Sequence, residues 1–236
     1  MPRSYFIFKS IDSRNMNIIC RGPAPLIKPE ERVDHIQIPG RSGDLTELQG
    51  VDIYNPYIQT IGISVVGGDN VPAVCRWLSG TGDVTFSSDP DMTQEARVIG
   101  AVTLEKLSRN LDRWVGQVQF YCQPLKKLGS STPVTITGNA NVRNNGDVRS
   151  FPTIVVNRAG NATQATITVN GKTFIINNFL GYRKIYSAAQ EVTTWNDAAL
   201  ETKNTSGAFP VLEVGNNTIS GTGWSSLEIY KEERYF

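Results

Sequence analysis

Short runs of β-branched and aromatic residues, each closed by Gly, Pro, Asn or Asp, recur along nearly the whole chain of 236 residues. Side chains of this kind pack well on a pleated surface, and the closing residues permit tight turns. The pattern therefore predicts a mainly β protein. The runs that carry most of this prediction are 61–66, 101–104, 115–120, 134–137, 154–156 and 165–169.

Two segments in the second half have the pattern of β-hairpins. In Thr166–Ile176, alternating runs flank Asn170-Gly171, a pair that tolerates the positive φ angles of a type I′ turn. Near the C-terminus, 218–220 and 226–230 alternate around the glycine-rich segment 221–224, which predicts a final hairpin with one buried face. Around 104–111 a helix is a weaker alternative to a hairpin connection over 107–112.

One amphipathic helix is expected between Asn70 and Gly80. Asn70 can cap the first turn, Pro72 suits an early helical position that needs no N–H donor, and Gly80 can take the left-handed terminal conformation. The helix would pack on a sheet through one apolar face, made of Val71, Val74, Trp77 and Leu78.

The length favours two domains, because one compact domain usually has about 100 to 150 residues. The best boundary follows Phe120–Pro124, where the segment 126–133 gathers Lys, Gly, Ser and Pro before a new strand begins. We therefore expect domains at 1–128 and 129–236.

Charge and hydropathy exclude several classes of partner. The net charge is +1 and the basic residues are scattered, which argues against nucleic-acid recognition. No apolar run approaches the length of a membrane span or a secretory signal, so we expect no membrane insertion and synthesis in the cytosol. Cys20, Cys75 and Cys122 are too far apart for a CxxC motif and are expected to be reduced core residues.

Motifs for catalysis, metals and phosphates are absent from the sequence. His35 is the single histidine, and the chain has no Gly-x-Ser-x-Gly elbow, no metal-ligand spacing and no Walker loop. We therefore expect no enzyme, no cofactor and no metal, although a carboxylate pair for glycoside hydrolysis stays open among the 22 acidic residues. Trp195 and Trp224 could stack on a sugar ring if they are exposed, and core packing is the alternative.

The most informative motif is Ile38-Pro39-Gly40-Arg41-Ser-Gly-Asp44-Leu45. By itself it could be a plain hairpin loop. It resembles, however, the Pro-Gly-Arg signature near the N-terminus of distal tail proteins of long-tailed, non-contractile bacteriophages. Further segments resemble that family in the same order: 76–78 with 84–86 and 89–91, 120–124, 144–154, 209–219 and 227–229. One small departure is that Val214-Gly215 stands where Pro-Gly is frequent in the family.

The resemblance implies an N-terminal β-sandwich with one α-helix and an extended hairpin, followed by a C-terminal galectin-like β-sandwich. It implies a structural virion protein whose homohexameric ring forms the hub at the phage tail tip. Such a ring would join the major tail tube protein and the tape-measure protein to the tail-associated lysin or to a tail fibre or receptor-binding protein. Assembly would take place in the cytoplasm of the bacterial host.

The candidate ring-interface residues are Arg41, Asp44, Tyr54 and Tyr57, because Tyr and Arg are favoured interface anchors. The alternative for Arg41 and Asp44 is an ion pair across their own turn. Two other functions compete with the hub. One is a carbohydrate-binding adaptor of the tail tip that recognises host cell-wall glycans through Trp195 and Trp224, and the other is a hydrolase.

Overall fold

The computed structural model describes residues 4–130, 132–194 and 196–236. The chain divides into two compact units, the first reaching to Gly129 and including Phe236, the second spanning 130–235. Both units are built from antiparallel strands, and the part of the chain that is described contains one α-helix. The predicted fold class, mainly β with a sandwich architecture and one helix, is confirmed.

The first unit contains one α-helix, α1 (Val71–Trp77), and one continuous nine-stranded sheet of order β2-β1-β7-β8-β10-β6-β3, in which β11 also pairs with β8 and β9 with β10. A separate two-stranded sheet is formed by β4 and β5. The strands are β1 (Phe6–Phe8), β2 (Ile11–Asp12), β3 (Ile18–Cys20), β4 (Val33–Ile36), β5 (Leu45–Leu48), β6 (Tyr57–Val66), β7 (Thr81–Phe86), β8 (Met92–Ile99), β9 (Leu104–Ser108), β10 (Leu111–Cys122) and β11 (Lys127–Leu128).

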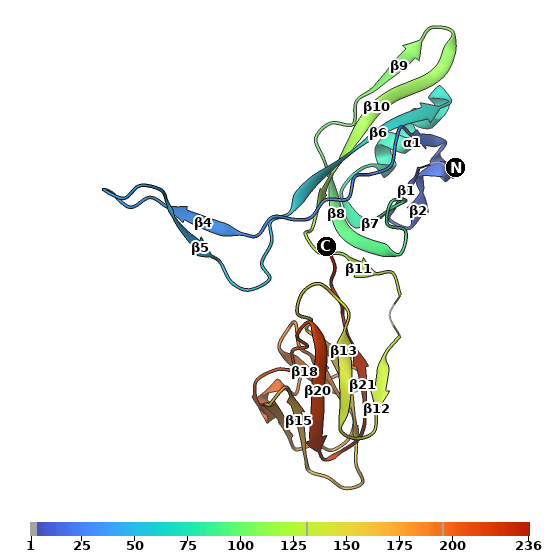
Figure 1. Cartoon of the computed structure of the whole chain (residues 1–236). Helices are drawn as coiled ribbons and strands as arrows, with labels where there is room; N and C mark the ends of the chain where they lie inside the picture. Colours follow the sequence, from blue (N-terminus) through green and yellow to red (C-terminus); the bar gives the residue numbers. More distant parts are fainter. Residues whose placement is uncertain (1–3, 131, 195) are drawn as a thin grey trace. The chain divides into compact units, whose positions relative to one another are not determined.

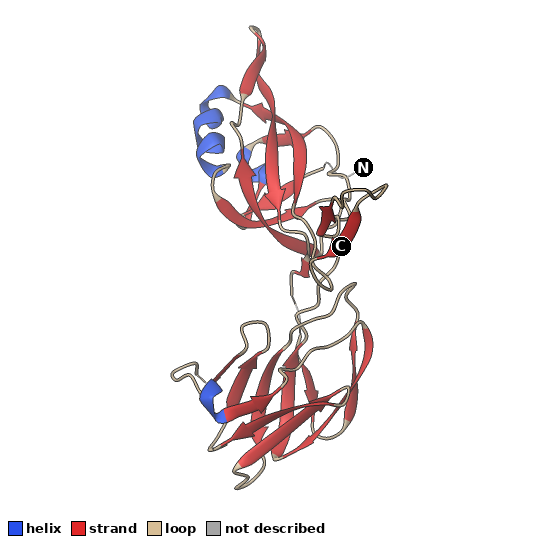
Figure 2. Cartoon of the chain, turned by 90° about the vertical axis from the view of Figure 1, so that its left-hand side faces the viewer, coloured by secondary structure: helices blue, strands red, loops and turns tan. Residues whose placement is uncertain are grey.

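The large sheet curls around an aromatic core. Phe6 and Phe8 of β1 each lie 5.4 Å, between ring centroids, from Phe120 of β10, although β7 and β8 separate these strands in the hydrogen-bonding order. Trp77 of α1 stacks on Phe6 at 5.6 Å, so the helix covers the same core, and Figure 2 shows it in blue beside the sheet. The strands of one sheet therefore form both layers of this unit.

The helix differs from its prediction in two details. Val74, Trp77 and Leu78 are buried, as predicted. Asn70, however, does not cap the helix, because a 3₁₀ turn at Gly68–Asn70 precedes it and has already placed Asn70 in helical backbone geometry; its side-chain amide donates instead to the Val66 carbonyl. Cys75 is exposed rather than buried, because it lies on the side of the helix that faces away from the core.

The predicted strand at 101–104 is wrong except for its last residue. Ile99 of β8 lies opposite Gln119 of β10, and Leu104 of β9 lies opposite Gly116. Residues 100–103 therefore face only two residues of β10 and bulge out of the ladder. The connection at 107–112 is a hairpin between β9 and β10, which excludes the alternative of a helix.

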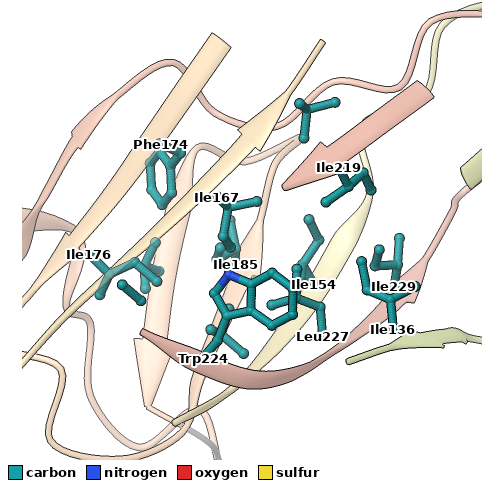
Figure 3. Packing of buried hydrophobic residues seen from close by; sticks show 14 of the residues in the cluster. Ile136, Ile154, Ile167, Phe174, Ile176, Ile185, Ile219, Trp224, Leu227 and Ile229 are labelled. Atoms are coloured by element: carbon teal, nitrogen blue, oxygen red, sulfur yellow. The ribbon is translucent and has the colours of Figure 1, made fainter. Parts of the chain in front are cut away.

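The second unit is a sandwich of two five-stranded sheets, of order β12-β21-β14-β17-β18 and β13-β20-β15-β16-β19. Both sheets contribute apolar side chains to one shared core, which Figure 3 shows from close by. The strands are β12 (Val134–Ile136), β13 (Ala140–Asn144), β14 (Thr153–Arg158), β15 (Gln164–Val169), β16 (Lys172–Asn177), β17 (Arg183–Tyr186), β18 (Glu191–Thr194), β19 (Thr205–Gly207), β20 (Gly215–Thr222) and β21 (Trp224–Tyr230).

The two hairpin predictions for this unit have opposite outcomes. β15 and β16 pair around Asn170 and Gly171, whose φ angles are 49° and 82°, as predicted for a type I′ turn. The final hairpin is wrong, because β20 and β21 belong to opposite sheets. The chain crosses at Gly221-Thr222-Gly223, where a Cβ on Gly221 would meet the Thr166 carbonyl oxygen at 1.9 Å. A side chain would not fit this close approach.

Candidate assembly surface

A long hairpin extends from the first unit (Figure 1). This hairpin, residues 31–54 and here called the arm, is built on the two-stranded sheet of β4 and β5. Its base is closed by backbone bonds from Arg32 N to the Ile53 carbonyl and from Asn55 N to the Glu30 carbonyl, at 2.9 and 2.7 Å. Every residue from 34 to 51 is exposed. Because two-stranded sheets are marginally stable alone in water, the arm is suited to a partner that covers it.

The surface of the arm is unusually apolar for a solvated hairpin. Ile36 lies opposite Leu45, and Val33 lies opposite Leu48. The two pairs are three residues apart along the strands, and successive side chains alternate between faces, so one apolar pair lies on each face of the arm. A concave region of about 420 Å³ lies beside its base and is lined in part by Leu48, Val51 and Tyr54. Clustered apolar surface of this kind marks interaction sites. The large exposed side chains are Ile36, Ile38, Leu45, Leu48, Val51 and Ile53, between 38% and 65% exposed.

Two acidic residues also lie opposite each other on the arm. Asp34 of β4 faces Glu47 of β5, and the Gln49 side-chain amide donates to the Asp34 carboxylate at 2.8 Å. Like charges in this position destabilise a strand pair. The arm thus combines apolar surface with a charge arrangement that disfavours it in isolation.

The tip of the arm carries the predicted Arg41 and Asp44. Gly40 and Gly43 take φ angles of 81° and 80°, as the turn chemistry requires, and Arg41 N donates to the Ile38 carbonyl. Both Arg41 and Asp44 are exposed, and within residues 4–130 no ion pair joins them. The alternative of a pair across their own turn is therefore wrong.

The two tyrosine candidates are engaged within the first unit. The Tyr54 ring packs edge-on against Phe236, with 5.0 Å between centroids, at the base of the arm. Tyr57 begins β6 and donates its hydroxyl to Gln94 Oε1 at 2.9 Å, and burial raises the pKa of Tyr57 to about 12. Tyr57 therefore stabilises this unit from inside and is a weaker interface candidate than Arg41 or Asp44.

The two candidates for sugar stacking are Trp195 and Trp224. Trp195 lies outside the described residues. Trp224 is a core residue, 7% exposed, whose indole N–H donates to the Thr166 carbonyl at 3.0 Å. Trp224 therefore takes the core-packing alternative, and it lies among the buried apolar side chains of the sandwich (Figure 3).

The single histidine of the chain lies on the arm. His35 is exposed on β4, opposite Thr46. Over residues 4–130, 132–194 and 196–236, no group of three His, Cys, Asp or Glu side chains could hold a metal ion. No helix in those same ranges has the length and hydropathy needed to span a membrane.

Sequence reasoning found the tip of the arm and missed its apolar sides. The signal was present, since Ile36 and Ile38 alternate with polar residues before the turn and Leu45 follows it. Alternation of this kind normally indicates one buried face. Here the rest of the described chain buries neither face, which only the structure reveals.

Comparisons with known proteins identify the fold. No protein-family model matches the sequence, and no curated protein matches it. The structure is similar to the crystal structure of the Dit protein of phage SPP1, described as a paradigm of the hub adsorption apparatus in phages that infect Gram-positive bacteria, with a TM-score of 0.78 and 16% identity over 100% of both chains. A chain of the phage P2 baseplate in its activated conformation with Ca has a TM-score of 0.48 and 8% identity over 97% of this chain and 98% of that one.

Proposed function

We propose that this chain is a structural virion protein of a bacteriophage and forms a homohexameric ring, the hub, at the distal end of the tail. The observation that carries the proposal is the fold shared with SPP1 Dit from end to end. The proposed ring joins the major tail tube protein and the tape-measure protein to the lysin, fibre or receptor-binding protein that engages the host. In this role the chain acts through its interfaces and catalyses no reaction.

The arm supports the proposal because a closed ring needs two different, complementary surfaces on each subunit. An arm with apolar pairs on both faces, Ile36 with Leu45 and Val33 with Leu48, can be one of them. A neighbouring copy that received the arm would bury these side chains and could place a cation near Asp34 and Glu47. Arg41 and Asp44 at the tip would then add directional polar contacts.

The oligomeric state tests the ring directly. Light scattering on the purified protein should give a particle of about six times the 26.0 kDa of one chain. Negative-stain images should show a six-fold ring with a central channel. A protein that stays monomeric at high concentration, with no ring in any image, would contradict the proposal.

The role of the arm is tested by Leu48→Glu, with Leu180→Glu as the matched control. Both side chains are exposed, 59% and 73%, so neither substitution should unfold its unit. A charge at Leu48 would have to be buried in the ring, and we expect the ring to dissociate into smaller species. Leu180 lies on the second unit, and its variant should keep the mass of the ring.

Arg41→Ala examines the tip of the arm separately. If Arg41 contributes to the ring, its loss should weaken assembly, seen as dissociation at a higher protein concentration than for the parent chain. An unchanged hexamer of unchanged stability would remove Arg41 from the interface and leave the apolar sides of the arm as its main contacts.

A further inference from the structure

The outer face of one sheet in the second unit forms a groove with aromatic walls. Thr153 of β14 lies opposite Tyr186 of β17 on one side and opposite Tyr230 of β21 on the other. The next residue of β14, Ile154, is fully buried in the core, so Thr153 and its two neighbours point away from it. A small side chain between two tyrosines leaves a channel between rings about two strand spacings apart, roughly 9.6 Å.

The groove continues along the strands. Val155 lies opposite Lys184 and Glu228, two positions further on the same face. It is 3% exposed yet does not belong to the core cluster, so it is buried on the outer side and forms the floor. The cavity has a volume of about 470 Å³. This size is within the usual range for small-molecule sites.

A second hollow of about 220 Å³ extends the groove at one end. It shares Thr153, Tyr186 and Glu232 with the first, and Phe151 is among the residues that it adds. Glu232 lines both hollows with a φ angle of 51°, a left-handed conformation that costs free energy for a residue other than glycine. Strained residues of this kind are concentrated at binding sites.

The Tyr186 wall is held in place by a polar network. The Tyr186 hydroxyl donates to Asp197 Oδ1 at 2.9 Å, and Asp197 also accepts from the Thr193 hydroxyl at 2.7 Å. The Lys184 ammonium lies 3.3 Å from Asp197 Oδ2 and 4.7 Å from the centre of the Tyr186 ring. A ring fixed in this way loses little conformational entropy when a ligand packs against it.

Charged side chains of both signs surround the groove. Carboxylates accept hydrogen bonds and cations donate them, so the rim can pair with a ligand that carries many hydroxyl groups. A strongly charged ligand of either sign would therefore meet like charges at the rim. The cations are Arg149, Lys184 and Arg234, and the acids are Glu191, Asp197, Glu228 and Glu232.

From these observations we infer that the groove between Tyr186 and Tyr230 binds a neutral saccharide. The tyrosine rings would pack on the apolar faces of a pyranose, and the charged rim would pair with its hydroxyl groups. This site is distinct from Trp195 and Trp224. It goes beyond the proposed role in the ring and does not depend on it, because every residue of the groove belongs to the second unit.

The test uses the full-length protein on an array of immobilised glycans that includes neutral oligosaccharides and poly(glycerol phosphate). Thr153→Tyr should fill the groove, and Tyr230→Ala should remove one wall. Thr168→Tyr is the matched control, because Thr168 is a half-buried threonine of the opposite sheet, outside the groove. Thermal unfolding and the mass of the particle are measured for each variant.

We expect the parent chain and Thr168→Tyr to bind neutral glycans, and Thr153→Tyr and Tyr230→Ala to lose at least about tenfold in affinity, which is 1.4 kcal/mol. Absence of binding to any neutral glycan would overturn the inference. So would binding that survives both groove variants, or binding to poly(glycerol phosphate) alone. A missing ring with intact glycan binding would instead count against the proposed hub and leave this site standing.

Discussion

The arm and the hairpin of β15 and β16 begin from the same local chemistry and end in opposite environments. Each has two antiparallel strands joined by a turn in which glycine takes a positive φ angle. In the second hairpin Ala165, Ile167 and Val169 are buried, as are Phe174 and Ile176 of the facing strand, whereas every residue of the arm from 34 to 51 is exposed. Local pattern thus specifies a hairpin, and its surroundings decide how stable it is.

The difference is one of free energy. Full burial of a large apolar side chain contributes about 1.5 to 3 kcal/mol, and the hairpin of β15 and β16 buries several of them against the opposite sheet. Within the described chain the arm receives almost none of this stabilisation. Its apolar residues can contribute only when another molecule covers them, which is why the arm is the part of the chain best suited to assembly.

The strongest test of this contrast is the removal of one isoleucine from each hairpin. Ile167→Ala should lower the free energy of unfolding by about 2 to 5 kcal/mol, because Ile167 is fully buried. Ile36→Ala should change it by less than about 0.5 kcal/mol, since Ile36 is 42% exposed. Urea unfolding at a dilution where light scattering shows single chains measures both. Equal losses would mean that the chain buries the arm after all.

The turns give a second, smaller contrast. Gly171→Ala should destabilise the second unit by about 1 to 2 kcal/mol, because Gly171 has a φ angle of 82° that a Cβ disfavours. Gly40→Ala introduces the same local strain at 81°, yet global unfolding of the dilute chain should hardly change. The arm carries little of the total stability. Calorimetry resolves the two, and a large loss for Gly40→Ala would contradict the comparison.

The smallest expected effect is a dependence on pH that belongs to the second unit. Burial raises the pKa of Glu233. Hydrogen bonds from Asn145 N–H, Lys231 and Tyr235 together lower it by more than burial raises it, so the pKa lies below the usual glutamate value of 4.5. The contribution to stability is therefore complete above pH 4.5 and is lost as the pH falls through the pKa of the folded state.

Unfolding followed between pH 3 and pH 7 measures this contribution. Glu233→Gln should flatten the loss of stability on the acid side. The arm variant Gly40→Ala should keep the pH dependence of the parent chain. An identical acid profile for Glu233→Gln and the parent chain would show that Glu233 contributes no such dependence.

The sequence predicts those features that neighbouring residues determine. The type I′ turn at Asn170-Gly171, the buried positions Val74 and Trp77 of the helix, and the turn at the tip of the arm all depend on residues a few positions apart. The mainly β fold follows from the same local patterns. The distal-tail resemblance added the extended hairpin, and the structure contains one.

The wrong predictions concern features that depend on residues distant in the sequence. The pattern at 218–230 has the alternation of a hairpin, but strand choice depends on partners such as β14 and β15, far away along the chain. The exposure of Cys75, an expected core residue, likewise depends on packing that composition does not reveal. The groove between Tyr186 and Tyr230 exists only because the register places Thr153 between them.

The crossing at Gly221-Thr222-Gly223 has a mechanical consequence. It connects β20 and β21, each of which has a hydrogen-bonded neighbour on both sides, β13 and β15 for one and β12 and β14 for the other. A pulling force applied to the C-terminal end of the second unit would load β21 along its length and reach β20 through the crossing. Four ladders of hydrogen bonds would then be loaded together in shear. An edge strand that is peeled away would instead lose its hydrogen bonds one at a time.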